Sequence, residues 1–290
     1  MKKFTFFTFI LLALTFSVPF ISVQGVIVGE EFEFVVQKAT GTFNYVDVTT
    51  VSGETNKFRV GDTAIDKGDK ITVQVDALGA SSVDYTIYDE SVTQLADVTS
   101  SNLGFALSLL YYSFYPFIMM GISTGSVTDL DVSKGVSLGD GFYIAPPGIN
   151  WNDLYDYYNN PTNWASLYSG FDNDEGNVTT EATATWYDFG DTLAFEIDVS
   201  GTYAVVAEST HLGIYHSLRF DYNVTNNLLQ GYDMFTLISG DYQGVNTNFG
   251  MTVQVTETSY TRDIGVSFLL IGLVSILSLS VIILIRRRSK

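Results

Sequence analysis

The residue types that most often carry out chemistry are scarce in this chain. Its 290 residues include two histidines, His211 and His216, and no cysteine. Their odd spacing would place the two imidazoles on opposite faces of a strand, so we do not expect them to bind one metal ion together. The lack of cysteine excludes thiol catalysis, cysteine-based zinc sites and disulfide bonds.

One short segment matches a catalytic motif. Gly121, Ser123 and Gly125 form a Gly-x-Ser-x-Gly pattern, which in serine hydrolases makes a sharp turn between a strand and a helix of an alternating β/α chain. The residues that follow, 126–135, have no helical pattern, and the chain shows no such alternation. We therefore predict no enzymatic activity, no catalytic residue and no cofactor.

An acidic segment is the candidate metal site. Asp172, Asp174 and Glu175 offer the oxygen ligands that calcium prefers, and Gly176 follows them. The spacing differs from that of an EF-hand, in which the glycine stands one place later and a glutamate closes the loop. A solvated loop is the favoured interpretation, and calcium binding is the weaker hypothesis.

Two features of the sequence concern carbohydrates, one as attached glycans and one as a bound ligand. Asn177 and Asn223 each begin an Asn-Val-Thr triplet, the acceptor pattern for N-glycosylation of exported proteins. The segment 154–168, "LYDYYNNPTNWASLY", combines Tyr, Asn and Trp as carbohydrate-binding platforms do. Ordinary β-protein cores have the same composition, so we favour a core role there and keep surface glycans as an alternative partner.

Both ends of the chain have the pattern of an exported membrane protein. Residues 1–25 carry two lysines directly after Met1 and continue as an uncharged apolar stretch, which is typical of a signal peptide, with an uncleaved anchor as the alternative. Residues 264–285 are uncharged, and a helix of that length spans about 33 Å, enough to cross a bilayer. The basic tail, 286–290, marks the cytoplasmic side. The sequence thus predicts a single-pass cell-membrane protein with an extracellular N-terminal domain.

The part between these ends is strongly acidic. The chain has 14 Lys+Arg and 32 Asp+Glu; six of the basic residues and none of the acidic ones lie in the terminal segments. Residues 26–263 therefore hold 14 − 6 = 8 basic and 32 acidic residues, a net charge of 8 − 32 = −24. Such a surface repels nucleic acid and anionic lipid headgroups, so we predict no nucleic-acid partner.

Apolar and polar residues alternate through this acidic part. The alternation is clearest at 71–75, 193–199, 218–222 and 251–255, and it predicts strands with one buried and one solvated face. Strands of this kind favour antiparallel sheets. We predict a mainly β fold, an antiparallel β-sandwich or curved meander, in which 150–158 is the one helical turn.

A short repeat marks the starts of several strands. Gly29, Gly68 and Gly190 are each followed by an acidic residue and then by apolar residues at every second position. The repeat predicts an N-terminal β module at 26–98 and a second module at 99–262, either separate or continuous with the first. In the second module, Asn226 and Asn227 predict a tight hairpin turn.

The segment 103–123 is free of charge and nearly long enough to span a membrane. Pro116 and several tyrosines and serines make it a poor spanning helix. We interpret it as core strands or a buried loop. The alternatives are a membrane-touching segment and the wall of an apolar ligand cavity.

Five segments carry a resemblance to a known family. They read "VIVGEEFEFVVQKATG", "VGDTAIDKGDKITVQV", "VDYTIYDE", "PPGINWNDL" and "RFDYNVTNNLLQGY". Together they resemble the choice-of-anchor S type cell-surface proteins of Asgard (Lokiarchaeota-like) archaea, although Asn223 and Asn227 replace an Asp and a Gly of the usual hairpin. The resemblance implies an exported, membrane-anchored archaeal protein of undefined role and supplies no catalytic residue.

Two functions are compatible with these features. The leading hypothesis is an extracellular surface protein with a structural, adhesive or recognition role, in contact with neighbouring surface proteins or surface glycans. The alternative is a binding module that holds a lipid or another hydrophobic ligand in a curved β-sheet.

Overall fold

The computed structural model describes residues 25–46, 50–113, 135–136, 139–158, 160, 162, 177–188, 190–205 and 209–260. Both predicted terminal segments therefore lie outside the described residues, except for Gly25. Within the described ranges, no helix is long and apolar enough to cross a membrane. The described residues up to Thr258 belong to one compact unit.

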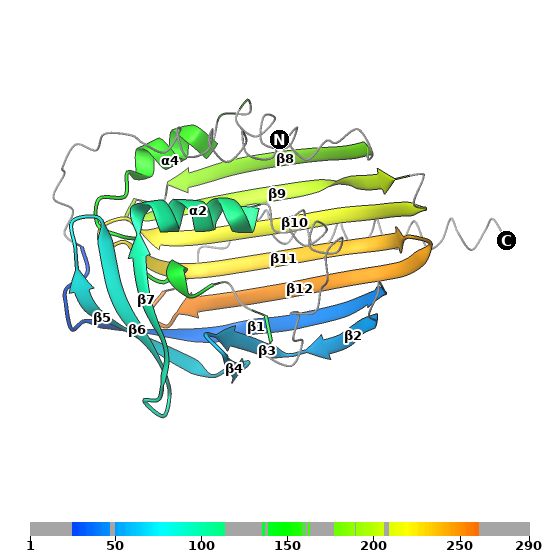
Figure 1. Cartoon of the computed structure of the whole chain (residues 1–290). Coiled ribbons are helices and arrows are strands. Elements are labelled where there is room, and N and C mark those ends of the chain that lie inside the picture. The colour runs from blue at the N-terminus through cyan, green and yellow to red at the C-terminus, as the bar shows by residue number, and fades with distance from the viewer. Residues whose placement is uncertain are drawn as a thin grey trace, which may run out of the picture. The chain divides into compact units, whose positions relative to one another are not determined.

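The unit is built around one antiparallel sheet of ten strands, which confirms the predicted mainly β fold (Figure 1). The strand order is β7-β6-β5-β1-β12-β11-β10-β9-β8, and β2 also pairs with β1. The strands are β1 (Glu31–Val46), β2 (Thr50–Thr55), β5 (Lys70–Leu78), β6 (Ser82–Asp89), β7 (Gln94–Ser101), β8 (Asn177–Asp188), β9 (Thr192–Val205), β10 (Thr210–Asn223), β11 (Leu228–Tyr242) and β12 (Val245–Glu257). A separate hairpin consists of β3 (Lys57–Val60) and β4 (Thr63–Asp66).

Strand β1 connects the two parts of the sheet. One edge of β1 pairs with β12 from Phe34 to Asn44. The other edge pairs with β5 near its start and with β2 near its end. Hydrogen bonding therefore continues from the N-terminal strands into the β8–β12 strands, so the described strands of both parts belong to one antiparallel sheet.

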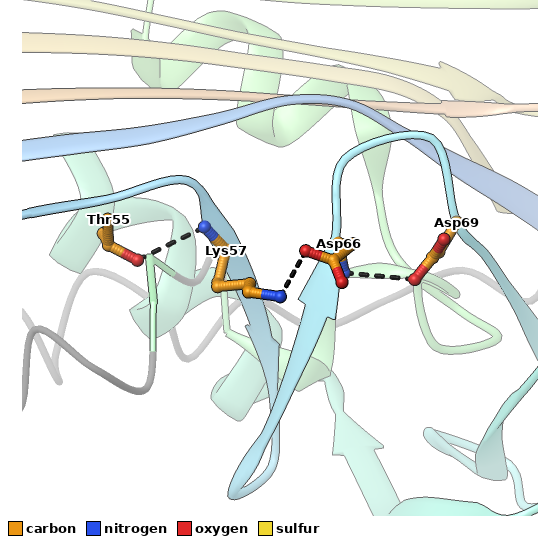
Figure 2. Close-up of polar contacts among 4 residues, drawn as sticks. All are labelled: Thr55, Lys57, Asp66 and Asp69. Carbon is orange, nitrogen blue, oxygen red and sulfur yellow. Dashed lines mark hydrogen bonds and ion pairs between the residues drawn. The ribbon is translucent and has the colours of Figure 1, made fainter.

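The turn repeat precedes three of the strands, as the sequence predicted. Gly29, Gly68 and Gly190 have φ angles of 85°, 95° and 83°, a region that L side chains rarely occupy. Strands β1, β5 and β9 begin two residues after these glycines. The acidic residue caps the turn in two cases: the Glu30 carboxylate accepts the Ile27 N–H at 2.9 Å, and the Asp69 carboxylate accepts the Asp66 N–H at 3.2 Å (Figure 2).

The same close-up shows how the small β3–β4 hairpin is held (Figure 2). The Lys57 ammonium group pairs with the Asp66 carboxylate across the two strands. The Lys57 N–H also donates to Thr55 Oγ1 at 3.2 Å. Because the Lys57 and Asp66 side chains are largely exposed, the pair sets the hairpin geometry more than it stabilises the fold.

One face of the sheet carries the apolar positions predicted from the alternation. Strands β5, β10 and β12 each bury three or more consecutive alternate side chains there, and we call this side of the sheet the inner face. Its fully buried members include Ile71, Val73, Leu218, Phe220, Val253 and Val255. Burial of this continuous apolar surface is the main source of stability for such a unit.

Two α-helices and one 3-10 helix pack on the inner face: α2 (Asn102–Ser113), η2 (Asp140–Phe142) and α4 (Trp151–Tyr158). Figure 1 shows α2 in front of the sheet. The prediction of helix at 150–158 is confirmed. The prediction of strands or a loop at 103–123 is wrong for its first part, because residues up to Ser113 form α2.

The side chains of α2 explain this difference. Phe105, Leu109 and Ser113 are all buried, and their spacing of four residues places them on one face of the helix. The opposite face is also apolar and lacks charges, so the sequence shows no helical period to distinguish it from a strand. The rest of the segment, 114–123, lies outside the described residues.

Candidate functional site

A set of buried and half-buried polar contacts on the inner face centres on η2. Hydroxyl groups from three strands donate to three consecutive carbonyl groups of this short helix. The pairs are Tyr85 with Asp140 at 2.6 Å, Ser100 with Gly141 at 3.3 Å and Tyr222 with Phe142 at 2.6 Å. Since these donors belong to β6, β7 and β10, η2 connects strands that are far apart in the sheet.

Aromatic rings fill the space around η2. The Phe142 ring stacks on Phe220 with centroids 4.9 Å apart and an interplanar angle of 23°. Phe105 of α2 contacts both Tyr222 at 5.5 Å and Trp151 of α4 at 6.2 Å. Edge-to-face and offset contacts of this kind add to the stability gained from burial alone. The inner face near η2 is therefore packed with aromatic side chains.

Two tyrosines beside η2 differ in their polar contacts. The Tyr143 side chain is fully buried and its hydroxyl has no hydrogen-bond partner, whereas that of Tyr85 is satisfied. Burial raises the pKa of both hydroxyls, and the nearby Asp140 carboxyl raises it further. Burial also raises the pKa of Asp140, although its carboxylate accepts the Gly61 N–H at 3.1 Å. These groups form a polar cluster on the apolar inner face, in which the two tyrosines are buried and Asp140 is half-buried.

His216 lies on the same inner face, on β10. Its side chain is fully buried, and Nδ1 is 2.8 Å from Thr236 Oγ1. Burial lowers its pKa to about 3, because the charged imidazolium cannot be solvated there. The Tyr112 backbone opposes this effect, yet Nε2 has no partner with hydrogen-bond geometry. His211 is exposed on the same strand, so the prediction that the two histidines face opposite sides is confirmed.

The opposite face of β10, which we call the outer face, carries a buried ionic cluster. Arg219 Nε donates to Asp221 Oδ1 at 2.7 Å, and its guanidinium lies 3.9 Å from Glu196 on β9. The three side chains are at most 5% exposed. The alternation predicted solvated positions here, and that prediction is wrong for this part of β9 and β10. Burial of these charges is tolerated because they compensate one another.

Two further groups on the outer face lie next to this cluster. Burial raises the pKa of Asp198, and the Ser217 hydroxyl, which donates to its carboxylate, partly offsets this effect. Asp198 Oδ1 is inaccessible to water and has no hydrogen-bond partner. Burial, followed by the charges of Asp198 and Glu196, raises the pKa of Tyr215 to about 12. Acidic groups outnumber basic ones at this place, as they do along the chain.

The residues singled out from the sequence are not brought together. The candidate calcium ligands Asp172, Asp174 and Glu175 lie outside the described residues, and so does Ser123 of the Gly-x-Ser-x-Gly segment. Asn177 is the first residue of β8, and its side chain is not described. In the described part of the chain, no group of three or more acidic or histidine side chains is arranged to hold a metal ion.

Asn223 is the candidate glycosylation site that the structure describes. It ends β10, and its Oδ1 accepts the Thr225 N–H at 2.9 Å and the Asn226 N–H at 3.3 Å. The side-chain amide is thereby held at the mouth of the β10–β11 turn. The hairpin turn predicted around Asn226 and Asn227 is present, although it has four residues, 224–227, between the paired Asn223 and Leu228, and Asn227 in it has a φ of 58°.

The groups that define the inner face were not identified from the sequence. Tyr85, Tyr222 and His216 look like ordinary strand residues, because their partners lie more than 15 residues away. Part of the outer cluster could have been recognised in the sequence. Arg219 and Asp221 stand two apart in an alternating strand, a spacing that places them on the same face.

Comparisons with protein-family models, with curated proteins and with solved structures found no match to this chain.

Proposed function

We propose that this chain is a single-pass cell-surface protein whose β-sheet unit is extracellular and has a structural, adhesive or recognition role. The observation that carries the proposal is the partition of charge. All 32 acidic residues lie between two uncharged apolar segments, and basic residues flank the outer end of each segment. This pattern favours export of the middle part, and a basic C-terminal tail favours the cytoplasmic side.

Features of the sheet unit support a role in contact and not in catalysis. Buried aromatic rings pack on the inner face near η2, and the tyrosine side chains there are buried. The two histidines face opposite sides of β10. We propose that the protein has no enzymatic activity and that its partners are neighbouring surface proteins or surface glycans, with Asn177 and Asn223 as glycosylation sites.

The resemblance to choice-of-anchor S type proteins of Asgard archaea remains part of this proposal. It would place the protein at the surface of an archaeal cell, in contact with the membrane through residues 264–285. The alternative, a binding module that holds a lipid or another hydrophobic ligand in the curved β-sheet, stays the weaker proposal. Calcium binding at Asp172, Asp174 and Glu175 stays the weaker hypothesis.

Protease shaving of intact cells tests the topology. Released peptides, identified by mass spectrometry, are expected to come from 26–262, and the tail 286–290 is expected to stay with the cells. Lysed cells are the control, since every segment is then accessible. Protection of the sheet unit in intact cells, or release of the tail, would rule out an extracellular unit with a cytoplasmic C-terminus.

A further inference from the structure

Several segments of the chain meet at the end of the sheet where β1 begins and β12 ends, which we call the proximal end. The Thr258 N–H, directly after β12, donates to the Glu33 carbonyl oxygen near the start of β1 at 2.8 Å. Strand β5 is antiparallel to β1 and therefore ends at the proximal end, where β6 begins, β7 ends and α2 follows. In Figure 1, β1 starts and β12 ends on the same side of the sheet.

Backbone contacts hold these segments together. The Gly29 N–H donates to the Val75 carbonyl oxygen at 2.8 Å, so the residues before β1 lie against β5. The Asn102 N–H donates to the Ser81 carbonyl oxygen at 3.1 Å, so the start of α2 lies against the β5–β6 turn. The segment before β1, the end of β5 with its turn, and the start of α2 therefore form one connected surface.

Exposed apolar side chains gather on this surface. Of the seven large apolar side chains that are exposed in the described part of the chain, four lie at the proximal end: Ile27, Val28, Leu78 and Leu103. Ile27 and Val28 are 71% and 54% exposed. Single exposed apolar residues are common on any protein, whereas a group of them marks a contact surface. We call these four side chains the proximal patch.

The loop before α4 extends the patch. A Cβ added at Gly148 would lie 3.4 Å from the Ala80 carbonyl oxygen in the β5–β6 turn. Ile149 and Trp151, which follow, are half-buried, and the Trp151 Nε1 donates to Asn227 at 3.0 Å. Tryptophan combines an apolar ring with one polar atom, and for that reason it is frequent where a protein meets the surface of a membrane.

The charges around the patch restrict what can cover it. Glu30, Glu31 and Asp76 belong to the same segments, and no lysine or arginine occurs in 26–31, 75–82, 101–103 or 146–153. Contact of two such ends from two copies of the chain would bring like charges together. Anionic headgroups would be repelled as well. An uncharged or zwitterionic lipid surface is the apolar partner that meets no opposing charge.

The course of the chain places the proximal end near such a surface. Only residues 259–263 separate Thr258 from the segment 264–285, a tether of at most about 20 Å when fully extended. If 264–285 crosses the bilayer, the proximal end lies within that distance of the lipid headgroups. Tethering raises the effective concentration of the patch at the surface, so a small apolar area is sufficient for contact.

We propose that the proximal patch docks on the lipid bilayer, with the side chains of Ile27, Val28, Leu78 and Leu103 among the headgroups. The inference rests on the proposed single-pass anchor and adds to it an orientation of the sheet unit. A tether alone would leave this unit free to rotate, whereas a docked patch holds the proximal end down and directs the β6–β7 and β11–β12 turns away from the membrane.

Site-specific fluorescence tests the contact, and the lack of cysteine in the native chain makes single-cysteine labelling direct. The full chain is placed in phosphatidylcholine nanodiscs with one copy per disc, with an environment-sensitive fluorophore on Val28→Cys or Leu103→Cys. Val92→Cys is the matched control, because Val92 is apolar, 78% exposed and in the β6–β7 turn at the other end of those strands.

Nitroxide-labelled lipids are expected to quench the probes at Val28→Cys and Leu103→Cys several-fold more than the probe at Val92→Cys. Aqueous iodide is expected to give the reverse order. Iodide quenching that is equal at all three positions would overturn the docking. Shielding from iodide without quenching by the lipids would also overturn it, because a protein segment and not lipid would then cover the patch.

A second comparison separates docking from mere proximity. The probe at Leu103→Cys is measured in a chain that also carries Ile27→Ser, Val28→Ser and Leu78→Ser, and its lipid quenching is expected to fall several-fold. The control chain carries Val92→Ser and Val245→Ser, at exposed apolar positions away from the proximal end, and is expected to keep the native quenching. Equal quenching in the two chains would overturn the proposal; circular dichroism checks that both are folded.

The lipid charge gives a further readout. Addition of phosphatidylglycerol to the discs is expected to lower the lipid quenching or leave it unchanged, which supports an apolar contact. Stronger quenching would indicate charge attraction and overturn it. Failure of the chain to co-purify with nanodiscs would refute the single-pass anchor itself and the contact with it, whereas co-purification with an iodide-accessible Val28→Cys probe would refute the contact alone.

Discussion

Tyr85 and Tyr222, on strands at different ends of the sheet order, donate their hydroxyls to carbonyl groups only two residues apart, those of Asp140 and Phe142, each at 2.6 Å. Strands β6 and β10 are separated by five positions in the sheet order. A short 3-10 helix can accept both hydrogen bonds only if the sheet curves around it. The two bonds therefore relate the curvature of the sheet to the position of η2.

Removal of these hydroxyls is expected to destabilise the unit. Tyr222→Phe leaves the Phe142 carbonyl buried without a donor, at a cost of about 1–3 kcal/mol in the free energy of unfolding. Tyr143→Phe is the matched control, because the Tyr143 hydroxyl has no partner to lose. Urea unfolding of the full chain in detergent, followed by circular dichroism, measures both changes. Equal losses in the two variants would contradict the role of η2 as a hydrogen-bonded centre.

The buried His216 is expected to make the protein less stable in acid. Its pKa is about 3 in the folded state and about 6.5 when the chain is unfolded. The unfolded state therefore binds the extra proton first, and stability falls as pH decreases from about 6.5 towards 3, by up to about 1.4 kcal/mol per pH unit. Above pH 6.5, both states are neutral and this dependence disappears.

Comparison of two variants separates the pH dependence caused by His216 from that caused by the carboxylates. His216→Gln keeps a polar group beside Thr236 and is expected to reduce the loss of stability between pH 6.5 and 4.5. His211→Gln, at an exposed position, is expected to retain the pH dependence of the native chain. Urea unfolding at several pH values gives the two curves. Parallel curves for His216→Gln and the native chain would show that this histidine is protonated when folded.

The outer cluster is expected to be sensitive to the loss of its cation. Arg219→Met leaves the Glu196 and Asp221 carboxylates buried without that compensation, at a cost of about 3–5 kcal/mol. The triple variant Arg219→Met, Glu196→Gln and Asp221→Asn removes all three charges and is expected to recover most of the loss. Lys70→Met, at an exposed ion pair with Glu33, is the control and should leave the unfolding midpoint almost unchanged. A mild effect of Arg219→Met would mean that water reaches the cluster.

The β10–β11 turn is expected to fix the position of α4. Trp151 Nε1 donates to Asn227 Oδ1 at 3.0 Å, while the Asn227 backbone has a φ of 58°. Asn227→Gly keeps the turn but removes the acceptor, at a cost of about 1 kcal/mol. Asn227→Ala removes the acceptor and also disfavours the positive φ of the turn, so it is expected to lower the free energy of unfolding by about 1–2 kcal/mol more. Hydrogen exchange should rise in α4 of both variants; unchanged exchange there would contradict an anchoring role.

Features that depend on neighbouring residues were determined by the sequence itself. Gly29, Gly68 and Gly190 marked three turns, because a glycine followed by an acidic residue meets a local requirement for positive φ. The alternation in β5, β9, β10 and β12 marked the buried face for the same reason, since the period of two follows from the strand geometry. The helix α4 was likewise recognisable from its own residues.

Features that depend on distant residues were decided only by the tertiary structure. The charge-free segment after Asn102 has no period of its own, so packing of Phe105 against Tyr222 and Trp151 selects the helix α2. The burial of Arg219 depends on Glu196, which lies on another strand. The pairing of β1 with both β5 and β12 joins the two parts of the chain. Local sequence fixes the shape of each strand, whereas long-range burial and pairing decide which strands meet.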